Sequence, residues 1–132
     1  MLTYGDALSS HNLKKLLDFH KKKKKIATVT AVHPPVRFGE IKFKNNKVVF
    51  FNEKIQLKNN WISGGFFVFN YKIFNYLDKT DSMFERKPIT KLVEKKQLSC
   101  FPHDGLWQCM DTLRDKEILE EMVKSHRFKY IK

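Results

Sequence analysis

The order of apolar and polar positions predicts a strand, a helix and a second strand in the first 32 residues. Residues 2–4 are typical of a short buried strand, after which Gly5 permits a tight turn and Asp6 stands at the strand's carboxyl end. Apolar residues then recur at helical spacing over residues 10–23, directly after this turn. Residues 26–32 are rich in β-branched side chains and carry no charge, which is typical of a strand buried on both faces. A strand, helix and strand of this length form a βαβ unit with parallel strands, so the pattern predicts an α/β fold.

Further strands are expected in the middle of the chain. Apolar residues over 41–50 flank Asn45 and Asn46, and this pattern predicts a hairpin because Asn tolerates the positive φ of tight turns. Residues 66–69 form another apolar strand directly after Gly64 and Gly65. Paired glycines at that place indicate either the close approach of a ligand or of another backbone, or a β-bulge.

The last third of the chain alternates between short helices and strands. The pattern predicts helices over residues 71–77 and 83–96, a strand over 98–101, a helix from Asp111 and Thr112 to about 125, and a basic tail over 126–132.

Composition fits one globular domain of 132 residues, since 42% of the residues are apolar. The sequence has neither an apolar stretch long enough to cross a membrane nor a secretory signal pattern, so we expect no membrane partner. Cys100 and Cys109 lack metal-ligand spacing, and we interpret them as reduced thiols of a cytoplasmic protein.

The net charge of +12 leaves two interpretations open. It could mark a protein that binds nucleic acid or another anionic surface. We favour solvated lysines, because the run over residues 21–25 stands where a helix should end and cations are stabilised there. Lysines also suit small anionic substrates. We therefore expect no nucleic-acid partner.

Two aspartates are candidates for a metal site. Asp6 and Asp111 each follow an apolar stretch and precede a predicted helix. If the two carboxylates converge, they offer oxygen ligands that suit Mg²⁺, and if they do not, each is a helix N-cap. Glu53 and Lys54 end a predicted strand, where the lysine could reach a phosphate or form only a surface charge pair.

Six stretches in a fixed order resemble the glucose-1-phosphate cytidylyltransferase family of sugar-1-phosphate nucleotidyltransferases. They are residues 3–6, 27–32, 34–40, 51–54, 61–69 and 103–115. The resemblance extends to about residue 123, and the block over residues 107–115 is its most specific part.

This resemblance implies a partial Rossmann-like nucleotide-diphospho-sugar transferase fold, with a mixed, mostly parallel sheet and flanking helices. Residues 1–125 would be the C-terminal part of such a domain, without its N-terminal half, and would hold the metal and sugar-phosphate half-site. The implied reaction joins CTP and α-D-glucose 1-phosphate to give CDP-glucose and diphosphate, a step towards surface polysaccharide. It also implies a homo-oligomer.

The resemblance assigns roles to individual residues. Asp6 and Asp111 would be Mg²⁺ ligands and, with Lys54, catalytic residues. The implied substrate-binding residues are Gly5 near the nucleotide or sugar-phosphate backbone, Gly39 and Glu53 at the hexose, Lys54 at the sugar phosphate, and Gly64 and Gly65 beside the sugar ring.

The chain also departs from the family pattern. The Gly-Gly-x-Gly-Thr-Arg loop that holds the triphosphate does not occur in the 132 residues, so we expect little activity from this chain alone. Ala7, Ser10 and Ile55 replace residues usual in the family. Two alternatives stay open, which are a non-catalytic subunit that joins a homologous oligomer and a uridylyl or thymidylyl relative.

Overall fold

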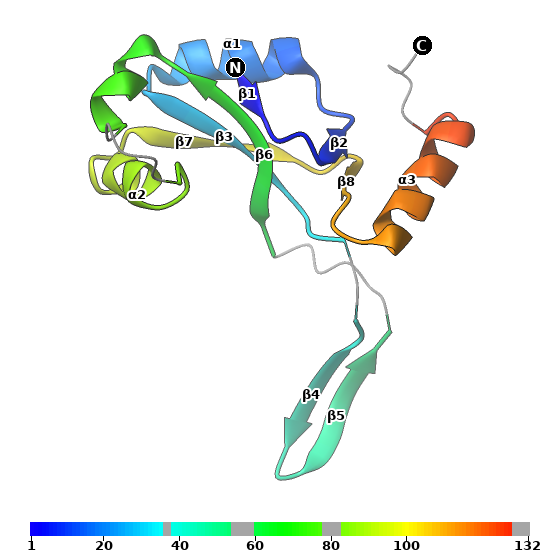
Figure 1. Ribbon diagram of the computed structural model, residues 1–132. Helices are drawn as coiled ribbons and strands as arrows, with labels where there is room; N and C mark the ends of the chain where they lie inside the picture. Colours follow the sequence, from blue (N-terminus) through cyan, green and yellow to red (C-terminus); the bar gives the residue numbers. More distant parts are fainter. Residues whose placement is uncertain (36–37, 54–59, 78–82, 128–132) are drawn as a thin grey trace.

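The computed structural model describes residues 1–35, 38–53, 60–77 and 83–127 (Figure 1). The strands are β1 (Leu2–Thr3), β2 (Ala7–Ser9), β3 (Ala27–Val32), β4 (Glu40–Lys44), β5 (Lys47–Asn52), β6 (Ile62–Phe69), β7 (Leu98–His103) and β8 (Trp107–Cys109). The helices are α1 (Leu13–Lys23), the 3₁₀-helix η1 (Tyr71–Tyr76), α2 (Lys87–Glu94) and α3 (Leu113–Lys124).

The central sheet has four strands in the order β1-β6-β3-β7. β3 runs parallel to β7, whereas β6 is antiparallel to both β1 and β3. Three of the four strands therefore point the same way, and β6 separates the two strands of the predicted βαβ unit. The prediction of an α/β fold with a mixed sheet and flanking helices is confirmed.

Helices cover both faces of this sheet, with α1 on one side and α2 on the other (Figure 1). On the α1 side, Nδ1 of His20 lies 2.8 Å from Oγ1 of Thr28 on β3. The preceding residue, Ala27, packs on the opposite face with Ile73 and Leu92. Successive strand residues point to opposite faces, so β3 is buried on both sides as its β-branched sequence predicts.

The hairpin of β4 and β5 projects away from the sheet (Figure 1). Asn45 and Asn46 have φ angles of 49° and 61°, which confirms the turn that these two residues predict. Val48 and Val49 are consecutive, and both are more than half exposed, at 61% and 66%. Both faces of the ribbon therefore carry apolar side chains.

The helix caps correct one interpretation of the aspartates. Asn12, not Asp6, caps α1 with its side chain. Thr112, not Asp111, caps α3, and it forms a capping box with Asp115. The alternative in which Asp6 and Asp111 are N-caps is therefore wrong.

Three other expectations need correction. β1 is an exposed edge strand rather than a buried one, since only β6 pairs with it among the described residues and Leu2 is 42% exposed. Strand β2 stands between Asp6 and α1, where the sequence predicted a helix at once. The helix predicted over residues 83–96 is shorter, because Pro88 fixes its first turn and Lys96 ends it with a φ of 54°.

No helix among the described residues is long and apolar enough to cross a membrane.

Candidate functional site

A cavity of about 660 Å³ brings most of the predicted site residues together. Asp6 and Asp111 line it, with Gly39 and with Gly64 and Gly65 of β6. These residues come from distant parts of the chain, so the fold and not the sequence spacing produces the site.

The short ribbon of β2 and β8 positions the two aspartates. Ala7 pairs with Cys109 in this antiparallel ribbon, and the Met110 N–H donates to the carbonyl oxygen of Asp6 at 2.7 Å. Asp6 precedes β2 and Asp111 follows β8 by two residues. Antiparallel pairing brings the start of one strand to the end of the other, which explains why both aspartates reach one cavity.

The donor set of this cavity suits a metal ion that is shared with a substrate. Asp6 and Asp111 supply carboxylate oxygens, and the Cys109 thiol donates to Oδ2 of Asp111 at 3.4 Å. The described residues contain no group of three or more His, Cys, Asp or Glu side chains able to hold a metal. Mg²⁺ commonly binds one or two carboxylates and completes its shell with phosphate oxygens and water, so the two aspartates fit it.

Gly64 and Gly65 are needed for close packing as well as for the cavity. A Cβ at Gly64 would lie 2.8 Å from Cγ1 of Val32. Gly65 has a φ of +75°, and a Cβ there would lie 2.7 Å from Cδ2 of Tyr4. The neighbouring strands thus approach the glycine backbone so closely that a side chain at either position would displace them.

The pairing of β3 with β6 is irregular at the same place. The register between β3 and β6 shifts between Val29 and Ala31, next to the two glycines. The indole N–H of Trp107 donates to the carbonyl oxygen of Gly64 at 2.9 Å, and this hydrogen bond connects β8 to the irregular part of β6. The register shift agrees with the interpretation of the paired glycines as a bulge or a similar irregularity, their contacts show the close approach of neighbouring strands, and the same residues line the cavity.

Tyr4 and Trp107 also line the cavity, although the sequence analysis gave neither a role in the site. The Tyr4 hydroxyl donates to the carboxylate of Glu85. Burial, and then this carboxylate, raise the pKa of the Tyr4 hydroxyl, so that it remains protonated. The sequence offered one sign that these two residues belong to the site. Both are aromatic residues among apolar neighbours, and each carries a hydrogen-bond donor that needs a partner.

The remaining predicted site residues lie elsewhere. Gly5 does not line the cavity, and Glu53 does not line it either. Glu53 adjoins it, because a Cβ at Gly39 would lie 3.6 Å from the Cα of Glu53. Lys54 lies outside the described residues, and the roles implied for all these residues stay predictions.

The comparison with known families identifies the class to which this fold and cavity belong. The nucleotidyl transferase family matches residues 1–125, and the chain belongs to that family. The chain is 41% identical over 120 residues to the glucose-1-phosphate cytidylyltransferase of Salmonella typhimurium, covering 91% of this chain and 47% of the relative. It is 30% identical to the glucose-1-phosphate adenylyltransferase of Thermosipho africanus, covering 83% of this chain and 30% of that protein. The chain thus spans about half the length of the cytidylyltransferase that it matches.

A solved structure supports the fold. The structure of a Bacillus anthracis protein assigned as a glucose-1-phosphate thymidylyltransferase, in complex with sucrose, matches with a TM-score of 0.64 at 18% identity. The match covers 92% of this chain and 53% of that one. At this identity the likeness concerns the arrangement of helices and strands.

Proposed function

We propose that this chain supplies the metal and sugar-phosphate side of a glucose-1-phosphate cytidylyltransferase. The complete reaction would convert CTP and α-D-glucose 1-phosphate to CDP-glucose and diphosphate, for polysaccharide synthesis in the cytoplasm. The observation that carries the proposal is the cavity that Asp6 and Asp111 share with Gly64 and Gly65. Identity of 41% to a cytidylyl enzyme against 30% to an adenylyl enzyme favours CTP as the nucleotide.

The chemistry of nucleotidyl transfer explains these residue types. Transfer needs positioned phosphates and neutralisation of the charge that develops on their oxygens, which Mg²⁺ supplies when it is bound. In the proposal Asp6 and Asp111 hold this ion, and Lys54 neutralises the sugar phosphate. In the proposal Gly64 and Gly65, which line the cavity, lie beside the sugar ring.

Binding measurements test the proposal without requiring turnover. Isothermal titration of the chain with α-D-glucose 1-phosphate should show binding that Mg²⁺ strengthens. Asp6→Asn and Asp111→Asn should each reduce the Mg²⁺-dependent part about tenfold or more, because each removes one charged ligand. Asp18→Asn, at an exposed position of α1, is the matched control and should bind like the wild type. Unchanged Mg²⁺-dependent binding in both cavity variants would contradict the proposal.

We further propose that the chain forms a homo-oligomer through the ribbon of β4 and β5. The ribbon projects from the body of the fold, and a two-stranded hairpin alone is marginally stable in water. Its large apolar side chains are exposed, and a second ribbon could cover them. These side chains are Ile41, Phe43, Val48, Val49, Phe50 and Phe51.

A further inference from the structure

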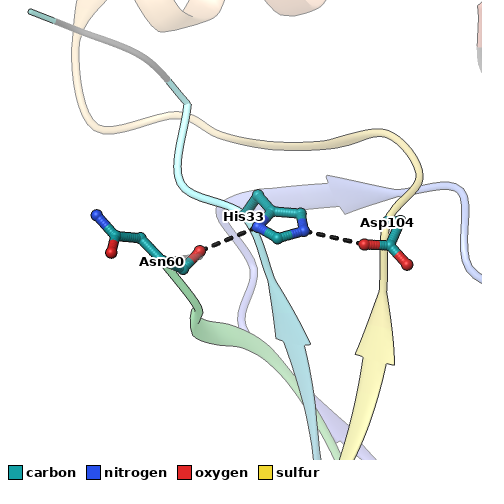
Figure 2. Close-up of polar contacts among 3 residues, drawn as sticks. All are labelled: His33, Asn60 and Asp104. Carbon is teal, nitrogen blue, oxygen red and sulfur yellow. Dashed lines mark hydrogen bonds and ion pairs between the residues drawn. The ribbon is translucent and has the colours of Figure 1, made fainter. Parts of the chain in front are cut away.

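His33 joins two segments of the chain at the end of β3. It is the first residue after this strand, and only 8% of its side chain is exposed. Nδ1 lies 3.0 Å from the carbonyl oxygen of Asn60, and Nε2 lies 2.9 Å from Oδ1 of Asp104 (Figure 2). The ring thus lies between two oxygen atoms on opposite sides.

These contacts connect the ends of three neighbouring strands. Asn60 lies shortly before β6, and Asp104 directly follows β7. Since β3 lies between β6 and β7 in the sheet, His33 holds both neighbours at the edge where β3 ends.

The chemistry of the two partners decides the form of the ring. A carbonyl oxygen and a carboxylate both accept hydrogen bonds, and a neutral imidazole has only one N–H to donate. Only the ring with protons on both nitrogens donates to Asn60 and to Asp104 at once. The Trp61 ring packs against the same ring, with centroids 3.9 Å apart and the two planes tilted by 36°, and an aromatic ring attracts a cation at that distance.

The segments held by His33 form one side of the cavity. Pro34 and Pro35 follow His33 directly and line the cavity, as do Asn60 and Ile62. His33 is not among the lining residues, so any effect on a ligand must pass through the segments that it holds.

We propose that His33 is a positioning residue. Its protonated ring holds the two cavity-lining segments, residues 34–35 and 60–62, at the distance from each other that a bound sugar phosphate requires. The proposal rests on the proposed function, because it names the control of that same cavity. Asp104, on the connection from β7 to β8, is the charged group that forms an ion pair with the ring among the described residues. Asn60 and Trp61, before β6, carry no charge. A ring with one N–H donates to only one of the two oxygens and turns a lone pair towards the other, so it holds only one of the two segments.

Titration with α-D-glucose 1-phosphate at about pH 6 and about pH 8 measures this coupling. His33→Gln should weaken binding about threefold to tenfold at the lower pH and have a smaller effect at the higher pH. Asp104→Asn keeps an acceptor without its charge and should show a reduced difference between the two pH values. His126→Gln and Asp18→Asn, at exposed positions, are matched controls that should keep the wild-type pH profile. Because the phosphate of the ligand titrates equally in every variant, comparison at each pH isolates the contribution of the ring.

Nuclear magnetic resonance of the full chain provides a test that needs no ligand. The ring ¹⁵N signals of His33, identified by their loss in His33→Gln, should show protons on both nitrogens, as its contacts with Asn60 and Asp104 require. His33→Gln should also shift the amide signals of Asn60 and Ile62, whereas His126→Gln should not. If the wild type fails to bind the sugar phosphate, the proposed function is wrong, but these signals still test whether His33 holds the two segments. If His33→Gln binds the sugar phosphate like the wild type and leaves the amide signals of Asn60 and Ile62 unshifted, His33 is not a positioning residue.

Discussion

Gly65 and Tyr4 are packed so closely that their backbones are hydrogen-bonded and no side chain fits between them. The Tyr4 N–H donates to the carbonyl oxygen of Gly65 at 3.0 Å. A Cβ at Gly65 would lie 2.7 Å from the Tyr4 ring. This contact attaches the edge strand β1 to β6 and sets one wall of the cavity.

Gly65→Ala should lower the free energy of unfolding by about 2 to 4 kcal/mol. The positive φ strains a residue with a Cβ, and the added methyl group forces the Tyr4 ring to move. Urea denaturation measures the loss. Gly5→Ala is the control, because nothing lies within 4 Å of a Cβ at Gly5. Equal losses in the two variants would contradict this account.

Thr112 and Asp111 are neighbours at the start of α3, but replacing Thr112 should affect stability and replacing Asp111 should affect metal binding. Thr112→Ala removes the cap of the helix and should cost about 1 to 2 kcal/mol of stability. Asp111→Asn should change stability by less than about 0.5 kcal/mol, because the residue is exposed and is not the cap. Mg²⁺ titration should give the opposite order, with the larger loss in Asp111→Asn. A large stability loss in Asp111→Asn would indicate a structural role instead.

Acid should destabilise the fold through its buried histidines. Burial lowers the pKa of both His11 and His20 from 6.5, and the nearby His103 lowers that of His11 further. The unfolded chain therefore takes up protons below pH 6.5 while the folded chain does not. Through these two residues, the free energy of unfolding should fall as the pH decreases from 6.5 towards the lowered pKa values.

Urea denaturation at a series of pH values measures this slope. His20→Gln should show a shallower fall with decreasing pH, and His126→Gln, at an exposed position, should keep the wild-type slope. A slope in His20→Gln as steep as that of the wild type would contradict the prediction.

Self-association should depend on the ribbon. Replacing Phe43 and Phe51, which are 70% and 63% exposed, by Ser should shift the sedimentation coefficient towards that of the monomer. Phe74→Ser is the matched control, since Phe74 is 73% exposed on η1, outside the ribbon. A wild type that sediments as a monomer at high concentration would rule out the proposed contact.

The purified chain alone should form little CDP-glucose from CTP and α-D-glucose 1-phosphate. The Gly-rich triphosphate loop of the family does not occur in its 132 residues. Chromatography of the products, with a full-length glucose-1-phosphate cytidylyltransferase as the positive control, measures the turnover. Turnover comparable to that of the control would show that the loop is dispensable.

The sequence predicted the strongly patterned elements and missed those that depend on pairing. β3 was predictable from its β-branched run, and the hairpin from Asn45 and Asn46. β2 and β8 have three residues each, too few to show a period, and they exist because they pair with each other. The apolar character of residues 2–4 indicates a buried strand, but burial depends on neighbouring strands, and among the described residues only β6 pairs with β1.

The same limit applies to the site. Asp6 and Asp111 could be selected because each stands at a boundary between elements, but the expected reason, a helix directly after each, is wrong for Asp6. Their convergence depends on the β2–β8 ribbon. The contacts of His33 with Asn60 and Asp104 could not be predicted from the sequence around His33, because both partners are distant in sequence and meet it only in the folded sheet.

The two tryptophans of the chain give this site a built-in optical reporter. Trp107 lines the cavity, and Trp61 packs against His33, between the lining residues Asn60 and Ile62. When tryptophan is excited selectively, the fluorescence of the unlabelled chain therefore comes from indoles at or beside the cavity. Occupancy of the cavity and movement of its wall can both be followed in real time, with no dye attached.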